Sequence, residues 1–349
     1  MTRGMTANAK LYLLLALALV AALGVVTACG PTPTPVPPTK PPPTATPVPP
    51  TPTKAPEPNT LVALKALAAP KDAADAAWAK ATPLTFKANG IGSLSGKSLD
   101  VTAKALYTEG DVYLLFAWKD AQASLVKGAW RFDGTKWAKQ KGDEDRLAIM
   151  WEVAPIANFA AQGCAATCHG KTMGTNAAAE KGDLWHWKSY RSNPLGFADD
   201  GYIVQDDTAK GETGRKSDPG GGGDSKNETK EKDKPALMQD PAKAPTAKGF
   251  LLKDEAVEIK DYKAFKAGDV VPFRILTRPS GSRGDIKAVG VWQDGTWTLL
   301  LGRKLKTGND DDVQFDPAKS YPFSVAVYDD SGDENKYVST AALKLSFGK

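Results

Sequence analysis

The sequence predicts a mostly β protein, built as an antiparallel β-sandwich with short helices. Many short segments either alternate apolar and polar residues or are rich in bulky β-formers, turn residues separate them, and no long helical periodicity is present. Residues 98–107 alternate and residues 111–118 are bulky, and Thr108, Glu109 and Gly110 between them predict a hairpin turn. So many short strands in one chain favour a sandwich with the architecture of carbohydrate-binding modules.

The remaining strands are predicted from the same patterns. An alanine-rich stretch at residues 71–78 predicts a short helix before them, and Asp133-Gly134 and Asp294-Gly295 mark turns. The further strand segments are residues 129–132, 146–153, 254–259, 271–277, 286–292, 296–303, 321–328 and 343–347.

The N-terminus has the pattern of a secretory signal. Arg3 and Lys10 precede an apolar run over residues 11–26, and small residues lead to Cys29. The stretch Val-Thr-Ala-Cys ending at Cys29 resembles the lipobox of bacterial lipoproteins, whose cysteine carries the lipid. We therefore expect residues 1–29 to be a lipoprotein signal peptide, with an uncleaved membrane anchor as the alternative. Either way, the rest of the chain is expected outside the cytoplasm, on the extracytoplasmic or periplasmic face of the cell membrane.

A tether and one domain are expected to follow. Residues 30–58 are rich in proline and threonine, and they predict an extended polyproline spacer because proline restricts φ and removes backbone donors. Residues 59–349 are predicted to form the folded domain. Within it, residues 206–247 are rich in glycine, lysine and acidic residues and predict a flexible low-complexity insertion, with a split into two domains as the alternative. The net charge of +5 is spread among acidic residues, which argues against nucleic acid as a partner.

The residues that carry chemistry are concentrated in one window. The chain has two histidines, His169 and His186, and both lie between Cys164 and His186 together with Cys168 and Met173. Histidine and methionine ligate haem iron, and cysteine thiols attach haem covalently. However, three residues rather than two separate the cysteines in QGCAATCHG. A local disulfide or, less favourably, a zinc site is therefore also compatible with the spacing.

An aromatic stretch ends this window. Trp185 and Trp187 flank His186, and Lys188 follows. Aromatic side chains are suitable walls for a flat apolar ligand. If the stretch is extended, the two tryptophans share one face while His186 and Lys188 share the other; if it is helical, His186 aligns with Tyr190 instead.

Several motifs together resemble a known family. They are Asp75 to Trp78, Tyr113 to Asp120, Glu144 to Glu152, Gly163 to Gly170 with Met173-Gly174, Asp183 to Lys188 with Arg191, and Trp297 to Arg303. From about residue 61 to residue 347 the chain resembles the ethylbenzene dehydrogenase-related haem-binding domain, also described as the cytochrome c/dimethyl sulfoxide reductase-like haem-binding domain. The resemblance implies a β-sandwich with a haem-binding excursion, found in electron-transfer subunits of periplasmic molybdenum enzymes.

The resemblance also implies a b-type haem with methionine and lysine as axial ligands. Met173 matches the methionine, while Lys188, Lys304 and Lys306 are candidates for the lysine. Two arrangements stay open. In one, Cys164 and Cys168 form thioethers to a c-type haem with His169 as a ligand and Met173 or His186 opposite. In the other, the cysteines form a disulfide beside a non-covalent b-type haem.

The expected function is one-electron transfer by a lipid-anchored, extracytoplasmic haem protein in a respiratory chain. No catalytic set of residues is present, and the expected partner is a redox protein, possible examples being a molybdenum oxidoreductase or another respiratory component. The alternatives are a structural lipoprotein with a Cys164–Cys168 disulfide and a carbohydrate-binding protein. The sugar platform of the latter would be drawn from Trp118, Trp130, Trp137, Trp292 and Trp297.

Overall fold

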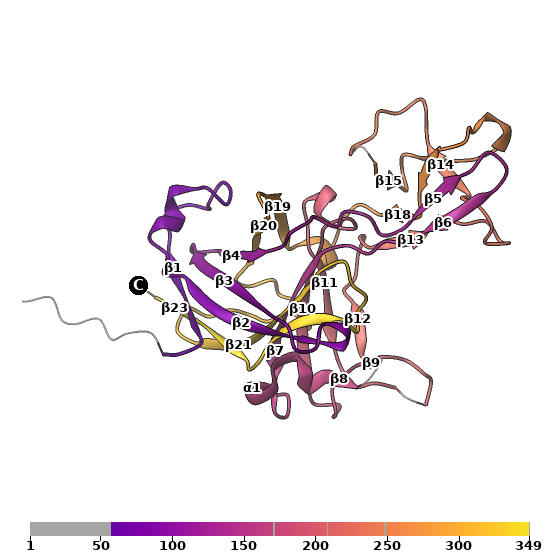
Figure 1. Ribbon diagram of the computed structural model, residues 1–349. Helices are drawn as coiled ribbons and strands as arrows, with labels where there is room; N and C mark the ends of the chain where they lie inside the picture. The colour runs from indigo at the N-terminus through magenta and orange to yellow at the C-terminus, as the bar shows by residue number, and fades with distance from the viewer. Residues whose placement is uncertain (1–56, 170–171, 208, 248, 349) are drawn as a thin grey trace, which may run out of the picture. The chain divides into compact units, whose positions relative to one another are not determined.

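One large sheet dominates the structure. The computed structural model describes residues 57–169, 172–207, 209–247 and 249–348. Thirteen strands belong to this sheet, eleven of them in the order β12-β11-β10-β7-β21-β22-β2-β3-β4-β20-β19 (Figure 1). The bounds are β1 Thr60–Lys65, β2 Leu84–Ile91, β3 Ser98–Tyr107, β4 Asp111–Lys119, β7 Arg146–Ala154, β10 Lys181–Lys188, β11 Asp199–Ile203, β12 Arg215–Ser217, β19 Lys287–Gln293, β20 Thr296–Lys304, β21 Ser320–Tyr328, β22 Lys336–Ser339 and β23 Leu343–Phe347.

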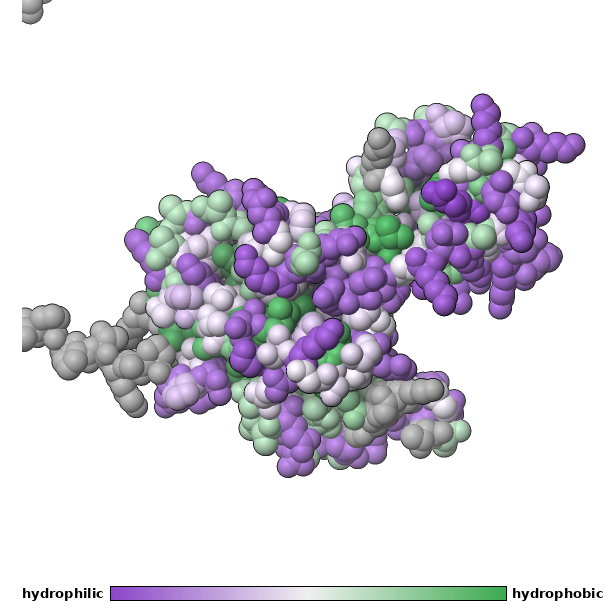
Figure 2. Space-filling model, viewed as in Figure 1, coloured by the Kyte–Doolittle hydropathy of each residue, from purple (hydrophilic) through white to green (hydrophobic). Residues whose placement is uncertain are grey.

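The strands are antiparallel along this order. The part of the sheet with β4 and β20 packs face to face on the part with β10, because Trp118 and Trp297 contact Trp187, so the predicted β-sandwich is confirmed. β1 is the exception, because it pairs in parallel with both β3 and β23, and β23 in turn pairs with β21. The principal core lies between the layers and includes five fully buried or nearly buried tryptophans. These are Trp118, Trp151, Trp185, Trp187 and Trp297. On the face shown in Figure 2, hydrophilic side chains predominate and hydrophobic ones appear in small patches.

Shorter elements complete the domain. The helices are η1 Ala76–Ala79, η2 Gly92–Leu94, α1 Phe159–Gln162, η3 Gly163–Thr167, η4 Asn193–Leu195, η5 Tyr262–Ala264 and η6 Ser282–Gly284. The strands outside the large sheet are β5 Ala129–Phe132, β6 Trp137–Gln140, β8 Cys168–His169, β9 Thr172–Met173, β13 Asp224–Lys226, β14 Leu237–Gln239, β15 Leu251–Leu252, β16 Ala256–Glu258, β17 Val270–Pro272 and β18 Arg274–Leu276. Among the described residues, none of the helices is long and apolar enough to cross a membrane.

The segment expected to be a flexible insertion has local structure. Residues 206–247 contain β12, β13 and β14, and a buried asparagine, Asn227, follows β13 and hydrogen-bonds to the start of β14. Its side-chain nitrogen donates to the carbonyls of Leu237 and Pro272, while its side-chain oxygen accepts from the amides of Ala236 and Leu237. Trp130 donates to its backbone carbonyl. The polar atoms of this buried side chain are therefore all hydrogen-bonded.

Candidate functional site

The stretch from Asp183 to Lys188 is extended, which settles the alternative left open by its sequence. It forms most of β10, which pairs with β7 on one side and with β11 on the other. Because side chains alternate across a strand, Trp185 and Trp187 point to one face and Leu184, His186 and Lys188 to the other.

Trp185 and Trp187 belong to the core between the layers. The ring of Trp187 lies 5.0 Å from that of Trp297 and 6.1 Å from that of Trp118, both edge-on. Trp185 lies 5.4 Å from Trp151. The two residues were expected to line the ligand site, but the structure places them on the opposite face of β10 from the cavity described next.

A cavity lies on the His186 face of β10, between β7, β10, β21 and the excursion that follows α1. Its volume is about 20 Å³, which is room for roughly one water molecule. Its apolar lining comes from Ala148, Met150, Leu184 and Ala326, and its remaining lining residues are Cys164, Met173, His186, Arg215, Ser324, Tyr328 and Lys336. Three of the predicted site residues, Cys164, Met173 and His186, are therefore brought together here.

His186 is buried, and its surroundings favour the neutral imidazole. Burial lowers its pKa well below the usual range, and the charges of Lys188, Arg215 and Arg146 act in the same direction. Nη2 of Arg215 lies 2.7 Å from Nδ1 of His186, whereas Nε2 has no hydrogen-bond partner among the described residues. The ring also stacks against Tyr328, with 5.8 Å between centroids. A polar atom is thus left unsatisfied in the interior, which is uncommon in folded proteins.

Cationic side chains surround this cavity. The guanidinium carbon of Arg146 lies 4.1 Å from the centre of the Tyr328 ring, and Arg146 also contacts Asp333. Nζ of Lys336 lies 5.6 Å from the centre of the same ring. Together with Arg215, these residues give the site a positive potential.

Lys336 is a residue that sequence reasoning missed. It begins β22, is 8% exposed, and its Nζ lies 3.8 Å from Sγ of Cys168 while donating to the carbonyl of Asp333 at 3.1 Å. Burial lowers the pKa of Lys336, but the opposing influence of Tyr328 and the two cysteines raises it overall. No motif marks this lysine, and the pairing of β22 with β21 and with β2 brings it to the site.

The two cysteines lie beside the cavity as free thiols. Cys164 is buried, and burial, with the nearby Cys168, raises its pKa to about 11. Cys168 is half-buried. The turn that carries them packs closely on β21, because a Cβ on Gly163 would lie 2.6 Å from Oγ of Ser324, and Gly163 has a φ of 56°. Close approach and positive φ both require glycine here.

The other predicted ligands lie elsewhere or cannot be placed. The backbone of His169 pairs with Thr172 in the β8–β9 hairpin, but its side chain lies outside the described part of the structure. Cys29, the signal peptide and nearly all of the tether also lie outside it.

None of the three lysines suggested by the sequence lines the cavity. Lys188 is buried in an ion pair with Asp199, which Arg283 also contacts at 2.6 Å. Burial lowers the pKa of Lys188 to about 8, although Asp199 favours its charged form. Lys304 and Lys306 are exposed.

These features define a class: a β-sandwich protein with a small buried cavity that combines thiols, a thioether, an imidazole and an amine. The family profile of ethylbenzene dehydrogenase matches residues 75–339, and the chain belongs to this family. No curated protein matches it.

Solved structures with a similar arrangement of strands were also found. One is a candidate carbohydrate-binding protein from Bacteroides uniformis, with 8% identity, a TM-score of 0.34, and coverage of 83% of this chain and 99% of that chain. Another is a family 9 carbohydrate-binding module from Caldicellulosiruptor kristjanssonii in complex with glucose, with 7% identity, a TM-score of 0.35, and coverage of 83% and 95%. At these TM-scores neither structure bears on what this chain binds.

Proposed function

We propose that the chain binds one haem at the cavity beside β10 and transfers single electrons. The observation that carries this proposal is the meeting of Met173 and Lys336 at one buried cavity, in a member of the ethylbenzene dehydrogenase family. A thioether and an amine are both ligands for haem iron, and they correspond to the methionine and lysine that the family resemblance implies. Lys336 thereby replaces Lys188, Lys304 and Lys306 as the candidate lysine.

The side chains at the cavity can ligate a haem, whereas the cavity is too small to hold one. A cavity of about 20 Å³ is far smaller than a porphyrin. Binding therefore requires the residues that line the cavity to move apart. The unsatisfied Nε2 of His186 and the surrounding cations are what such a ligand would meet, and a haem brings carboxylates that suit Arg215 and Arg146.

His186 is better suited to donate a hydrogen bond than to ligate iron. Arginine has no acceptor atom, so Nδ1 of His186 accepts from Arg215 and the ring proton lies on Nε2. A metal-ligating histidine has the reverse arrangement, with its second nitrogen donating to an acceptor.

When bound, the haem would supply reversible one-electron chemistry at iron. The residues of this chain would hold its plane, exclude water and set its potential. The positive charges of Arg146 and Arg215 favour the less positive, reduced form and are expected to raise the potential. The positions of Cys164 and Cys168 beside the cavity are compatible with thioethers to a c-type haem. The alternative was a disulfide beside a b-type haem, but in the structure the two cysteines are free rather than bonded to each other.

The wider setting of this proposal follows from the sequence. A lipid on Cys29 and the proline-rich tether would hold the domain at the extracytoplasmic face of a membrane, where a redox protein, such as a molybdenum oxidoreductase, is its partner. The protein would act as an electron carrier rather than as an enzyme. Of the five tryptophans suggested for a sugar platform, Trp118, Trp130 and Trp297 are buried, whereas Trp137 and Trp292 are half-buried.

The visible spectrum of the protein, purified from cells with ample haem supply, tests this function. We expect a Soret band in the wild type, which shifts in Met173→Ala and in Lys336→Ala, whereas the exposed Lys304→Ala is unchanged. A haem-stained denaturing gel of Cys164→Ser and Cys168→Ser variants then separates covalent from non-covalent attachment. Absence of a Soret band despite haem supply would contradict the proposal.

A further inference from the structure

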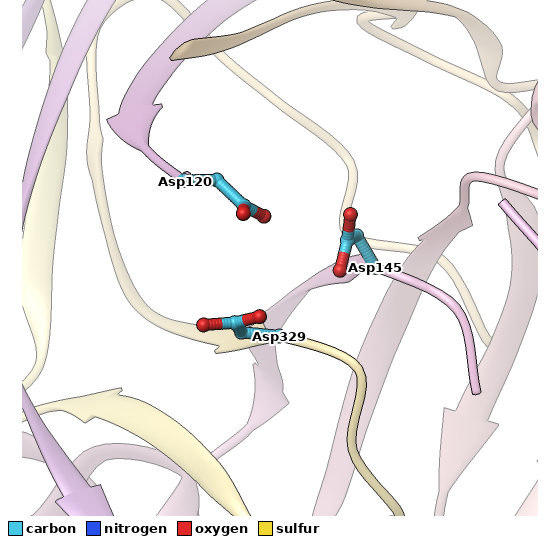
Figure 3. Close-up of side chains that lie close together, drawn as sticks. All are labelled: Asp120, Asp145 and Asp329. Carbon is cyan, nitrogen blue, oxygen red and sulfur yellow. The ribbon is translucent and has the colours of Figure 1, made fainter. Parts of the chain in front are cut away.

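Three aspartates, none of which lines the cavity beside β10, meet at one end of the sandwich. Asp120 follows β4, Asp145 precedes β7 and Asp329 follows β21, so three strand ends converge on one point. One carboxylate oxygen from each lies within 4.8 Å of the others. Figure 3 shows the carboxylate of Asp120 directed toward those of Asp145 and Asp329.

No positive side chain neutralises this cluster. Among the residues that the structure describes, no lysine, arginine or histidine forms an ion pair with any of the three aspartates. Burial and the charge of Asp145 raise the pKa of Asp120 to about 7. Burial also raises the pKa of Asp145, although hydrogen bonds from Ser124, Asp330 and Trp297 lower it. Burial raises the pKa of Asp329 as well, although the charge of Lys97 lowers it.

One oxygen of Asp120 independently indicates a missing ligand. Asp120 is only 6% exposed; its Oδ1 accepts from the amide of Gln122 at 3.0 Å, but its Oδ2 has no hydrogen-bond partner among the residues that the structure describes. Asp145, in contrast, is held in place by Ser124, Asp330 and Trp297. A buried, unpaired carboxylate oxygen that faces two other carboxylates requires either a proton or a cation.

We propose that Asp120, Asp145 and Asp329 bind a divalent cation that prefers oxygen ligands, calcium being the best fit. Calcium accepts carboxylate and water ligands in flexible geometry. A cavity of about 340 Å³ adjoins the cluster and is lined by Asp120 and Asp329, so water molecules can complete the coordination shell.

A second acidic cluster shows why the first stands out. Asp183, Asp200 and Asp312 are also buried together, but the guanidinium of Arg303 lies among them. Its Nη1 is 2.8 Å from Asp183, 3.3 Å from Asp200 and 3.2 Å from Asp312. A protein cation already occupies that position, and the Asp120 cluster has no equivalent.

A cation at this place would join the two layers of the sandwich. Trp118, two residues before Asp120, contacts Trp187 of β10, which is the neighbour of β7 in the sheet. Asp145 precedes Arg146, and Asp329 follows Tyr328, a residue of the haem cavity. The ion would thus stabilise the strand ends that carry these two side chains, whether or not haem binds.

Thermal unfolding of the full chain, with and without calcium, tests the proposal. Protein treated with a chelator is titrated with calcium chloride, and the same titration is made with magnesium chloride. We expect the wild-type Tm to rise with an apparent Kd of about 10⁻⁴ M, and more with calcium than with magnesium. In Asp120→Asn the apparent Kd should increase at least about tenfold, because one of three ligand charges is removed. Asp100→Asn, an exposed aspartate paired with exposed Lys87, is the matched control and should respond like the wild type.

A folding defect can be distinguished from loss of the ion. In chelator, Asp120→Asn should have a Tm equal to or above that of the wild type, because the amide relieves repulsion between carboxylates. Terbium(III) provides a second measurement, since Trp297 donates to Asp145 at 3.0 Å and lies close enough to sensitise its luminescence. If the wild-type Tm and terbium emission do not respond, or respond equally in Asp120→Asn, Asp120 and Asp145 share a proton only and the proposal is wrong.

Discussion

Arg215 Nη2 lies 2.7 Å from His186 Nδ1, at the edge of a cavity that also contains Met173 and Lys336. Because the guanidinium can only donate, this contact places the imidazole proton on Nε2. Nε2 has no hydrogen-bond partner among the described residues. The hydrogen bond between Arg215 of β12 and His186 of β10 therefore leaves Nε2 as the ring nitrogen that can contact a ligand.

Replacing Arg215 should raise the pKa of His186. In Arg215→Met a nearby positive charge disappears, but burial, the largest influence, remains, so the pKa should rise and still stay below the usual value of about 6.5. NMR titration of the imidazole C–H signals measures it, and a His169→Gln background leaves a single histidine. Lys216→Met, at the next position, is the control. An unchanged His186 pKa in Arg215→Met would mean that the two side chains are not in contact.

The low pKa of His186 should also make stability depend on pH. The folded-state pKa lies below the unfolded value, so the contribution is present above pH of about 6.5 and is lost as the pH falls, when the unfolded chain takes up the proton first. Urea unfolding of the wild type should lose about 1 kcal/mol more than His186→Gln between pH 6.5 and 5.5. Parallel losses in both proteins would contradict a neutral buried histidine.

Gly290 should tolerate no side chain because of Trp187. A Cβ at residue 290 would lie 2.2 Å from Cζ2 of Trp187, which is itself packed against Trp297. Gly290→Ala is expected to lower the free energy of unfolding by about 1–3 kcal/mol. Gly110→Ala, where a Cβ meets no atom within 4 Å, is the control and should change stability little. Equal effects at the two positions would show that Trp187 moves aside freely.

Arg303 should be essential for the fold at neutral pH and less so in acid. Arg303→Leu leaves Asp183, Asp200 and Asp312 buried without a counter-charge and should destabilise the protein by about 3–5 kcal/mol. Burial already raises the pKa of Asp183 and of Asp200, so protonation should reduce the defect as the pH falls from 8 toward 5, seen by urea unfolding.

The control for Arg303 is a surface arginine. Arg278 pairs with Asp254 and Glu255 but is about half exposed, and Arg278→Leu should change the free energy of unfolding by less than about 1 kcal/mol at either pH. A defect in Arg303→Leu that does not depend on pH would point to lost packing against Trp185 rather than to unpaired carboxylates.

Features that depend on neighbouring residues in the chain could be predicted from the sequence. The alternation at residues 98–107 and the bulky stretch at 111–118 predict β3 and β4, and the structure confirms the sandwich. The family motifs likewise lie in continuous stretches. The short strands of residues 206–247 could not be predicted, because they form by pairing with strands elsewhere in the chain: β12 with β11, β13 with β18 and β14 with β16.

The candidate site also contains residues that the sequence identifies and residues that only the tertiary structure identifies. Cys164, Met173 and His186 could be identified from their types and spacing within one short window. Lys336 and Arg215 could not, because they reach the cavity through the pairing of β22 with β21 and with β2 and of β12 with β11. The face on which Trp185 and Trp187 lie was likewise undecided until β10 paired with β7 and β11. The local sequence pattern specifies which residues alternate along a strand and which side chains can ligate a metal. Strand pairing over long sequence distances decides what each side chain faces, because only the assembled sheet brings distant residues together.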